Sequence, residues 1–183
     1  MGATATANWV MRPIMFDFAP NAAPTDKPEL YRELLAAARA LTEGEPDGVA
    51  NMANCAALIW TYLPDLNWAG FYRVAPNLAN QADELVLGPF IGKPACIRIA
   101  WGSGVCGTAA ATAQSQCVAD VHAFPGHIAC DAASRSELVV PIMRDGRVIA
   151  VIDLDSPSPA RFDADDTAGI EALAQVLGSR IES

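Results

Sequence analysis

The feature that most constrains the fold is a pair of apolar segments joined by Asp145-Gly146. Residues 138–143 read Leu-Val-Val-Pro-Ile-Met, and residues 147–155 read Arg-Val-Ile-Ala-Val-Ile-Asp-Leu-Asp. An Asp-Gly pair between two apolar runs predicts a β-hairpin, because a type I′ turn needs positive φ at both central residues. The chain is therefore expected to contain at least one pair of adjacent antiparallel strands.

Helical patterns flank the predicted strands. Apolar residues recur every three or four positions over residues 28–42, and an Ala-rich stretch over 47–62 predicts a second helix. A last helix is predicted from 163 to 181, with Asp163 as its N-cap. A shorter helix over 105–114 lies among further predicted strands at 67–74, 84–91, 96–99 and 116–119.

This order of elements predicts an α+β fold, with helices packed on a mostly antiparallel sheet. The length of 183 residues suits a single domain. Residues 1–24 are rich in Ala, Pro and Asn and show no clear period, so they are predicted to form a poorly ordered extension. Residues 25–183 are predicted to form the domain.

Composition excludes several classes of partner. The net charge of −9, without a Lys/Arg cluster, disfavours nucleic acid. No apolar run approaches the roughly 20 residues needed to cross a bilayer, and no signal-peptide pattern is present. We therefore expect a cytoplasmic protein, and the odd count of five cysteines argues against a disulfide scaffold.

Three of the five cysteines are candidates for chemistry. His122 and His127 both lie within eight residues of Cys130, and an imidazolium or a helix N-terminus lowers the pKa of a nearby thiol. Cys106 falls in the first turn of a predicted helix, which favours ionisation, and Cys96 falls on a predicted strand. The alternative for each is a small buried apolar residue.

A metal site is not indicated. The spacing His-x4-His-x2-Cys is not a zinc pattern, and the chain has no Cys-x-x-Cys. The alternative role for either histidine is structural, in which its hydrogen bonds order the loop. Cys55 and Cys117 are predicted to be packing residues.

Carboxylates form a second candidate group. Asp153 and Asp155 lie two apart on a predicted strand and so share a face, and Glu137 precedes another strand. Carboxylates held close together resist double ionisation, so one can keep a proton at neutral pH and donate it. Trp68 and Tyr72 also share a face. A solvated charged face and an ordinary core are the respective alternatives.

These residues lie in motifs that resemble free methionine-(R)-sulfoxide reductases, which are GAF-domain proteins. The motifs are Leu-Gly-Pro-Phe-Ile-Gly-Lys-Pro-Ala-Cys-Ile-Arg-Ile at 87–99, Gly-Val-Cys-Gly-Thr-Ala at 104–109, and the run from Asp120 to Glu137. The likeness covers about residues 28–181. It implies a six-stranded antiparallel sheet, with N- and C-terminal helices on one face and a short helix and loops forming a pocket on the other.

The resemblance also implies an activity, the reduction of free L-methionine-(R)-S-oxide to methionine. It makes Cys130 the catalytic thiol, Cys96 the main resolving cysteine and Cys106 a second one. Glu137, Asp153 and Asp155 would line the substrate pocket, with Trp68 and Tyr72 near the methyl end. The family implies a homodimer, thioredoxin as reductant, and no metal or bound cofactor.

The residues suggest how such a reaction would proceed. We expect the Cys130 thiolate to attack the sulfoxide sulfur while Glu137 or Asp155 protonates the oxygen. Asp153 suits the substrate ammonium, and backbone N–H groups around Ile128, Ala129 and Cys130 suit its carboxylate. Two alternatives remain open: a GAF module that senses a small ligand, and a thiol-based redox sensor.

Overall fold

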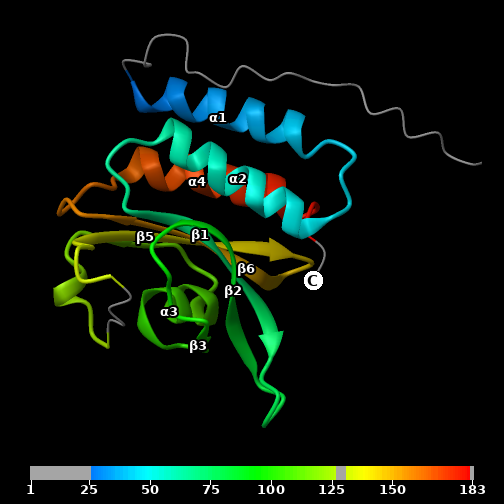
Figure 1. Ribbon diagram of the computed structural model, residues 1–183, viewed down its shortest axis with the longest axis vertical. Helices are drawn as coiled ribbons and strands as arrows, with labels where there is room; N and C mark the ends of the chain where they lie inside the picture. The colour runs from blue at the N-terminus through cyan, green and yellow to red at the C-terminus, as the bar shows by residue number, and fades with distance from the viewer. Residues whose placement is uncertain (1–25, 127–130, 182–183) are drawn as a thin grey trace, which may run out of the picture.

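Six antiparallel strands form one sheet at the centre of the computed structural model, which describes residues 26–126 and 131–181 (Figure 1). The strand order is β3-β2-β1-β6-β5-β4. The elements are α1 (Lys27–Leu41), α2 (Gly48–Tyr62), β1 (Trp68–Pro76), β2 (Asp83–Gly92), β3 (Arg98–Ala100), α3 (Gly104–Thr112), β4 (Gln116–Val118), the 3₁₀ helix η1 (Val121–Ala123), β5 (Ser136–Arg144), β6 (Arg147–Ser156) and α4 (Ala164–Leu177).

The predicted hairpin is confirmed as β5–β6. Asp145 and Gly146 both have positive φ, 49° and 76°, as a type I′ turn requires. The hairpin forms one of the two largest strand pairings, and β6 continues the sheet by pairing with β1. The strands therefore bring residues 68–73 beside residues 150–155, far apart in the sequence.

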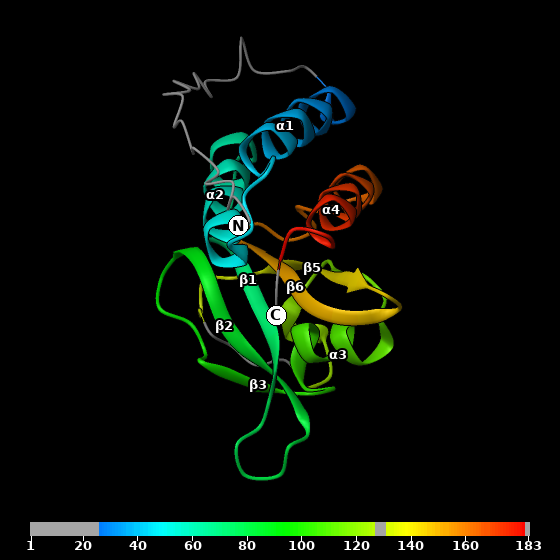
Figure 2. The same ribbon diagram turned by 90° about the vertical axis from the view of Figure 1, so that its right-hand side faces the viewer.

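Helices cover the two faces of the sheet unequally. α1, α2 and α4 lie on one face and α3 on the other, as two perpendicular views show (Figures 1 and 2). The main core fills the space under the three helices and includes Phe71, Leu138 and Ile152. A smaller core lies under α3 and includes Tyr72, Val139 and Val151. Alternate residues of β1, β5 and β6 thus contribute to the two cores, as the period of two predicts.

Aspartates begin three of the helices. Asp26, Asp47 and Asp163 each accept hydrogen bonds from backbone N–H groups of the first turn, at α1, α2 and α4. Asp163 also forms a capping box with Asp166, so the N-cap predicted for the last helix is confirmed. These caps satisfy donors that a helix start otherwise leaves unpaired.

The structure corrects three details of the sequence prediction. Cys96 lies in the loop before β3 and not on the strand, because Lys93-Pro94 follows the end of β2 and delays the next pairing. The turn of 3₁₀ helix at Val121–Ala123 was not expected. Cys117 is exposed on the edge strand β4 and is not a packing residue; its Sγ lies 3.5 Å from the carbonyl oxygen of Phe162.

The placements predicted for Cys55, Cys106 and the first three helices hold, and the last helix ends at Leu177 rather than near residue 181. Cys55 is buried in the main core, where burial raises the pKa of its thiol to about 12. None of the helices among the described residues is long and apolar enough to span a membrane. The predicted extension at residues 1–24 lies outside the described residues, and the domain boundary at residue 25 stays a prediction.

Candidate active site

A pocket opens on the sheet face opposite α1, α2 and α4. Its floor comes from β1, β5 and β6, and its walls from the start of α3 and two loops. The cavity among the described residues is small, about 40 Å³, and it opens to solvent at its mouth. The side chains that line it include those of Trp68, Tyr72, Lys93, Cys106, Asp131, Ser134, Glu137, Asp153 and Asp155.

Strand register gathers three carboxyl groups on the pocket floor. Glu137 of β5 is the direct cross-strand partner of Asp155 of β6, and Asp153 follows on the same face of β6. Side chains of directly opposite residues have Cβ atoms about 4.5–5.5 Å apart, and like charges there are destabilising. Glu137 and Asp153 are each only 6% exposed and Asp155 is half-buried, so water screens the repulsion within this group only weakly.

Burial and mutual repulsion keep protons in this group. Burial first, and then the charges of Asp153 and Asp155, raise the pKa of Glu137 well above its usual range. Burial and then the charge of Asp153 raise the pKa of Asp155 in the same way. Burial raises the pKa of Asp153 to about 7. Hydrogen bonding with Cys106 and Glu137 lowers it and so opposes a larger rise. The group can therefore supply a proton at neutral pH.

Cys106 faces these carboxyl groups from the opposite wall. It lies in the first turn of α3 and is 4% exposed, and its Sγ lies within 4.8 Å of a carboxylate oxygen of Asp153. Burial, followed by the charges of Asp153 and Glu137, raises the pKa of this thiol well above its ordinary value. The sequence prediction of easier ionisation is wrong here, because desolvation and nearby carboxylates outweigh the helix dipole.

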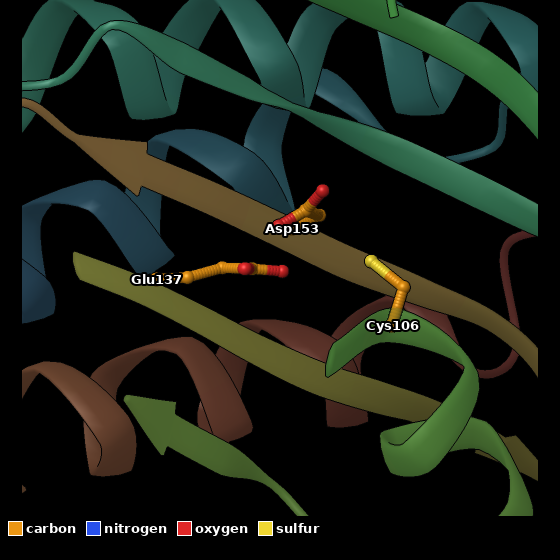
Figure 3. Close-up of side chains that lie close together, drawn as sticks. All are labelled: Cys106, Glu137 and Asp153. Atoms are coloured by element: carbon orange, nitrogen blue, oxygen red, sulfur yellow. The ribbon is translucent and has the colours of Figure 1, made fainter. Parts of the chain in front are cut away.

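One thiol and two carboxyl groups thus converge. Ligand atoms of Cys106, Glu137 and Asp153 all lie within 4.8 Å of one another, and their side chains point toward a common space (Figure 3). Such a set could hold a metal ion. Sequence spacing did not indicate it, because the three residues come from α3, β5 and β6. Within the described chain, the buried Oδ1 atom of Asp153 accepts no hydrogen bond.

Aromatic rings form the apolar wall. The Trp68 ring stacks on Tyr72 at 5.9 Å between centroids and on Phe90 at 5.3 Å. Its indole N–H donates to the carbonyl of Lys93, 3.1 Å away. A Cβ atom on Gly70 would lie 2.4 Å from Cβ of Phe90, so only glycine allows this stack. Phe90 was not predicted, because its place depends on the pairing of β1 with β2.

A polar network holds the loop after residue 130. Asp131 pairs with Lys93 at 3.0 Å and accepts from the backbone N–H of Ala133 at 3.0 Å. The amide of Asn67 donates to Asp131 at 3.3 Å and to Ser134 Oγ at 3.0 Å. The backbone hydrogen bond from Ala133 and then Lys93 lower the pKa of Asp131. Asp131 is thereby held at the pocket as a carboxylate.

The structure brings together most of the site residues predicted from the sequence. Trp68, Tyr72, Cys106, Glu137, Asp153 and Asp155 all line the one pocket. Cys96 is half-buried beside the lining residues Pro94 and Ala95. His122 is exposed on η1 and does not line the pocket. His127, Ile128, Ala129 and Cys130 lie outside the described residues.

Comparison with known proteins gives consistent matches over most of the chain. The GAF domain family matches residues 24–182. The chain is 53% identical over 165 residues to the protein ZMO0507 of Zymomonas mobilis, and this match covers 90% of this chain and 98% of that protein. It is 47% identical over 152 residues to the free methionine-R-sulfoxide reductase of Escherichia coli, covering 83% of this chain and 88% of that enzyme.

A solved structure extends these matches to three dimensions. The X-ray structure of free methionine-R-sulfoxide reductase from Neisseria meningitidis in complex with its substrate superposes with a TM-score of 0.80. The two chains are 45% identical, and the match covers 86% of this chain and 91% of the other.

Proposed function

Because the chain belongs to the GAF-domain family of free methionine-(R)-sulfoxide reductases, we propose that it reduces free L-methionine-(R)-S-oxide to L-methionine with a cysteine thiolate. One observation carries the proposal: carboxyl groups whose pKa values are raised and a stacked aromatic pair line the same pocket, on one face of the sheet. A sulfoxide needs both, an apolar site for its S-methyl end and an acid for its oxygen.

In this proposal each part of a free amino acid has a partner at the pocket. Trp68 and Tyr72 would hold the methyl end of the substrate. The ammonium group would pair with Asp153, whose Oδ1 has no partner among the described residues. The substrate carboxylate would be bound by backbone N–H groups around Ile128, Ala129 and Cys130, which lie outside the described residues. Peptide-bound methionine lacks the free ammonium and carboxylate and would be rejected.

The first chemical step forms a sulfenic acid. The Cys130 thiolate attacks the sulfoxide sulfur, and Glu137 or Asp155 donates a proton to the oxygen, because oxide itself is a poor leaving group. The attack forms an S–S bond to the substrate. The protonated oxygen then moves to the Cys130 sulfur as the substrate's S–O bond and this S–S bond break, so that methionine leaves and Cys130 becomes Cys–SOH. General acid catalysis of this kind contributes about 10²–10⁴-fold. The thiol is oxidised by two electrons and the sulfoxide reduced by two.

The second step returns the enzyme to its reduced form. The Cys96 thiol attacks the sulfenic sulfur, a Cys96–Cys130 disulfide forms, and water leaves. A thioredoxin dithiol then reduces this disulfide by thiol–disulfide exchange and becomes oxidised itself. Cys106 is proposed as a second resolving thiol, and no bound cofactor or metal takes part. We also propose that the protein is a cytoplasmic homodimer.

Turnover with separated epimers tests the function. Purified protein is incubated with each free methionine sulfoxide epimer and with thioredoxin, thioredoxin reductase and NADPH, and NADPH consumption is followed. We expect turnover with the free R epimer, little with the S epimer, and none with a peptide-bound sulfoxide. Cys130→Ser should abolish it. Binding of the sulfoxide without NADPH consumption would instead indicate a ligand sensor.

The same assay distinguishes the proposed enzyme from a thiol-based redox sensor. Such a protein would form the Cys96–Cys130 disulfide with peroxide, but it would not consume NADPH in proportion to the sulfoxide added. Methionine formed in amounts far above the amount of enzyme excludes it.

A further inference from the structure

A second cleft lies where the two central strands of the sheet separate. The pairing of β1 with β6 ends at Arg73 opposite Ala150. β1 nevertheless continues to Pro76 and β6 begins at Arg147, so the two strands diverge beyond their last pair (Figure 2). A cleft of about 740 Å³, open to solvent, is lined by these diverging segments. Its volume is within the roughly 300–1,000 Å³ typical of small-molecule sites.

This cleft is separate from the active-site pocket. The pairing of β1 with β6 begins with Trp68 opposite Asp155, which both line the pocket, and ends at Arg73, which lines the cleft. Trp68 and Arg73 are five residues apart on one strand, which corresponds to about 17 Å. Among the described residues, none lines both cavities. A ligand in the cleft would therefore leave the substrate position free.

Arg73 brings a buried donor to the cleft. Its side chain is half-buried, and its Nε atom is buried without a hydrogen-bond partner in the part of the chain that the structure describes. Buried polar atoms of proteins are nearly always hydrogen-bonded. A guanidinium group donates and cannot accept, so the partner that suits this atom is an acceptor, and an anion suits it best.

Arg147 adds a second positive charge to the lining. It is exposed, and within residues 26–126 and 131–181 neither it nor Arg73 forms an ion pair. The acid that lines the cleft is Asp83, which is opposite Pro76, three residues and about 10 Å along β1 from Arg73. The cleft thus carries a net positive charge, although the chain as a whole has a net charge of −9.

Apart from these three charged residues, the described lining is apolar. Val148 packs partly against the smaller core and Ile149 against the main core, and Ile181 is buried. Trp101, directly after β3, lines the cleft and is 37% exposed. An indole is a large apolar surface on which a flat ring can stack. The lining therefore suits a ligand that has an apolar body as well as a negative charge.

We propose that this cleft is a binding site for a small organic anion, a carboxylate or a phosphate attached to an apolar ring. Arg73 and Arg147 would bind the oxyanion, because the planar fork of a guanidinium group matches both carboxylate and phosphate. Trp101 and the aliphatic side chains would contact the ring. The site lies outside the proposed reductase pocket, so its test is independent of the sulfoxide chemistry.

NMR titration of ¹⁵N-labelled protein tests the site without any turnover. Phenyl phosphate and benzoate are the probes, and inorganic phosphate and benzyl alcohol present the anion and the ring separately. The Nε–H signal of Arg73, assigned by its loss in Arg73→Lys, should shift downfield with both probes. Each probe should bind about tenfold more tightly than inorganic phosphate or benzyl alcohol. The tighter of the two identifies the preferred oxyanion.

Substitutions of exposed residues separate the contributions of charge and ring. Arg147→Gln should weaken binding of phenyl phosphate about tenfold, the size of one hydrogen bond to a charged group. Trp101→Ala should weaken binding of phenyl phosphate and leave that of inorganic phosphate unchanged. Arg32→Gln is the matched control, because Arg32 is an exposed arginine outside the cleft that pairs with Glu29. It should leave binding unchanged.

Several results would overturn the proposal. An Arg73 signal that does not move at millimolar concentrations of either probe would show that no such anion binds. Equal binding of phenyl phosphate and inorganic phosphate, unaffected by Trp101→Ala, would indicate an unspecific ion contact. Displacement of phenyl phosphate by free methionine sulfoxide would place the probe in the active-site pocket.

Two other occupants of the cleft are also distinguished. Binding that appears only in Glu182→Gln would show that an acid of this chain, next in sequence after Ile181, occupies the arginines. Sedimentation velocity tests for a second copy of the chain. A dimer that dissociates in Arg147→Gln but not in Arg32→Gln would make the cleft a subunit interface, and either result would refute the ligand site.

Discussion

Glu137 and Asp155 face each other directly across β5 and β6, a buried and a half-buried acid in a position where a sheet usually avoids like charges. A protein built for stability alone would place apolar residues there. The raised pKa values of both groups favour their protonated forms and so reduce this repulsion, and the proposed reaction would use such a proton. The predictions below follow from this arrangement and from the contacts around it.

Amide substitutions of the pair should reveal the acid. Glu137→Gln and Asp155→Asn each remove one transferable proton with little change of shape. The substitution that removes the acid should lower kcat by about 10²–10⁴-fold, and the other should have a smaller effect. Steady-state kinetics with free methionine-(R)-sulfoxide measures both. Full activity in both variants would show that the proton comes from elsewhere.

Stability should fall as pH rises through the neutral range. The folded pKa values of Glu137 and Asp155 are raised, so the folded state keeps protons that the unfolded chain has already released above about pH 4. Their contribution is complete below the unfolded pKa and is lost as pH rises toward the folded pKa. Urea unfolding at pH 5.5, 6.5 and 7.5 should show the decline.

Glu137→Gln should weaken that pH dependence. Glutamine does not titrate, so the slope should decrease by up to about 1.4 kcal/mol per pH unit in the window where Glu137 alone titrates. Glu43→Gln, on an exposed residue, is the control and should leave the slope unchanged. An identical slope in Glu137→Gln and the wild type would contradict the raised pKa.

The buried carboxylate of Asp166 connects α4 to α1 and should make a large contribution to the free energy of unfolding. It accepts from Tyr31 Oη at 2.8 Å and pairs with Lys27 at 2.6 Å and with Arg161 at 3.2 Å. Tyr31→Phe should cost about 1.5–3 kcal/mol, because it removes a buried hydrogen bond to a charge. Chemical denaturation measures the loss. Arg32→Ala, which breaks only an exposed pair with Glu29, should change stability by less than about 0.5 kcal/mol.

Gly70→Ala should disturb the aromatic wall. The new methyl group would lie 2.4 Å from Phe90 and 2.7 Å from Trp68. We expect a loss of about 1–3 kcal/mol from overpacking, together with a higher KM for the sulfoxide. Gly44→Ala serves as the control, since nothing lies within 4 Å of its added carbon; its positive φ alone should cost some stability and leave KM unchanged. A normal KM in Gly70→Ala would argue against an aromatic methyl subsite.

Zinc should inhibit the enzyme, and chelation should not. Cys106, Glu137 and Asp153 offer sulfur and oxygen ligands that Zn²⁺ accepts, in the space proposed for the substrate ammonium. Protein treated with EDTA should keep full activity. Added Zn²⁺ should compete with the sulfoxide, and Cys106→Ser should be less sensitive to it. Loss of activity on chelation and its return with Zn²⁺ would reverse the proposal that no metal takes part.

Local sequence patterns determined much of the fold. The Asp145-Gly146 turn, the Asp163 cap and the four helices follow from interactions between residues close together in the chain. The shared face of Asp153 and Asp155, and of Trp68 and Tyr72, follows from the period of a strand. Each of these depends on a few neighbouring dihedral angles and needs no knowledge of distant segments.

Only the tertiary structure decided which groups meet. The pairing of Glu137 with Asp155 requires the register of the β5–β6 hairpin, and the stacking of Phe90 on Trp68 requires the pairing of β1 with β2. The contact of Cys106 with Asp153 requires α3 to pack on the sheet, and that packing reversed the ionisation expected from a helix N-terminus. Burial and the distance between charges depend on residues far apart in sequence, and they determine where the protons of this site reside.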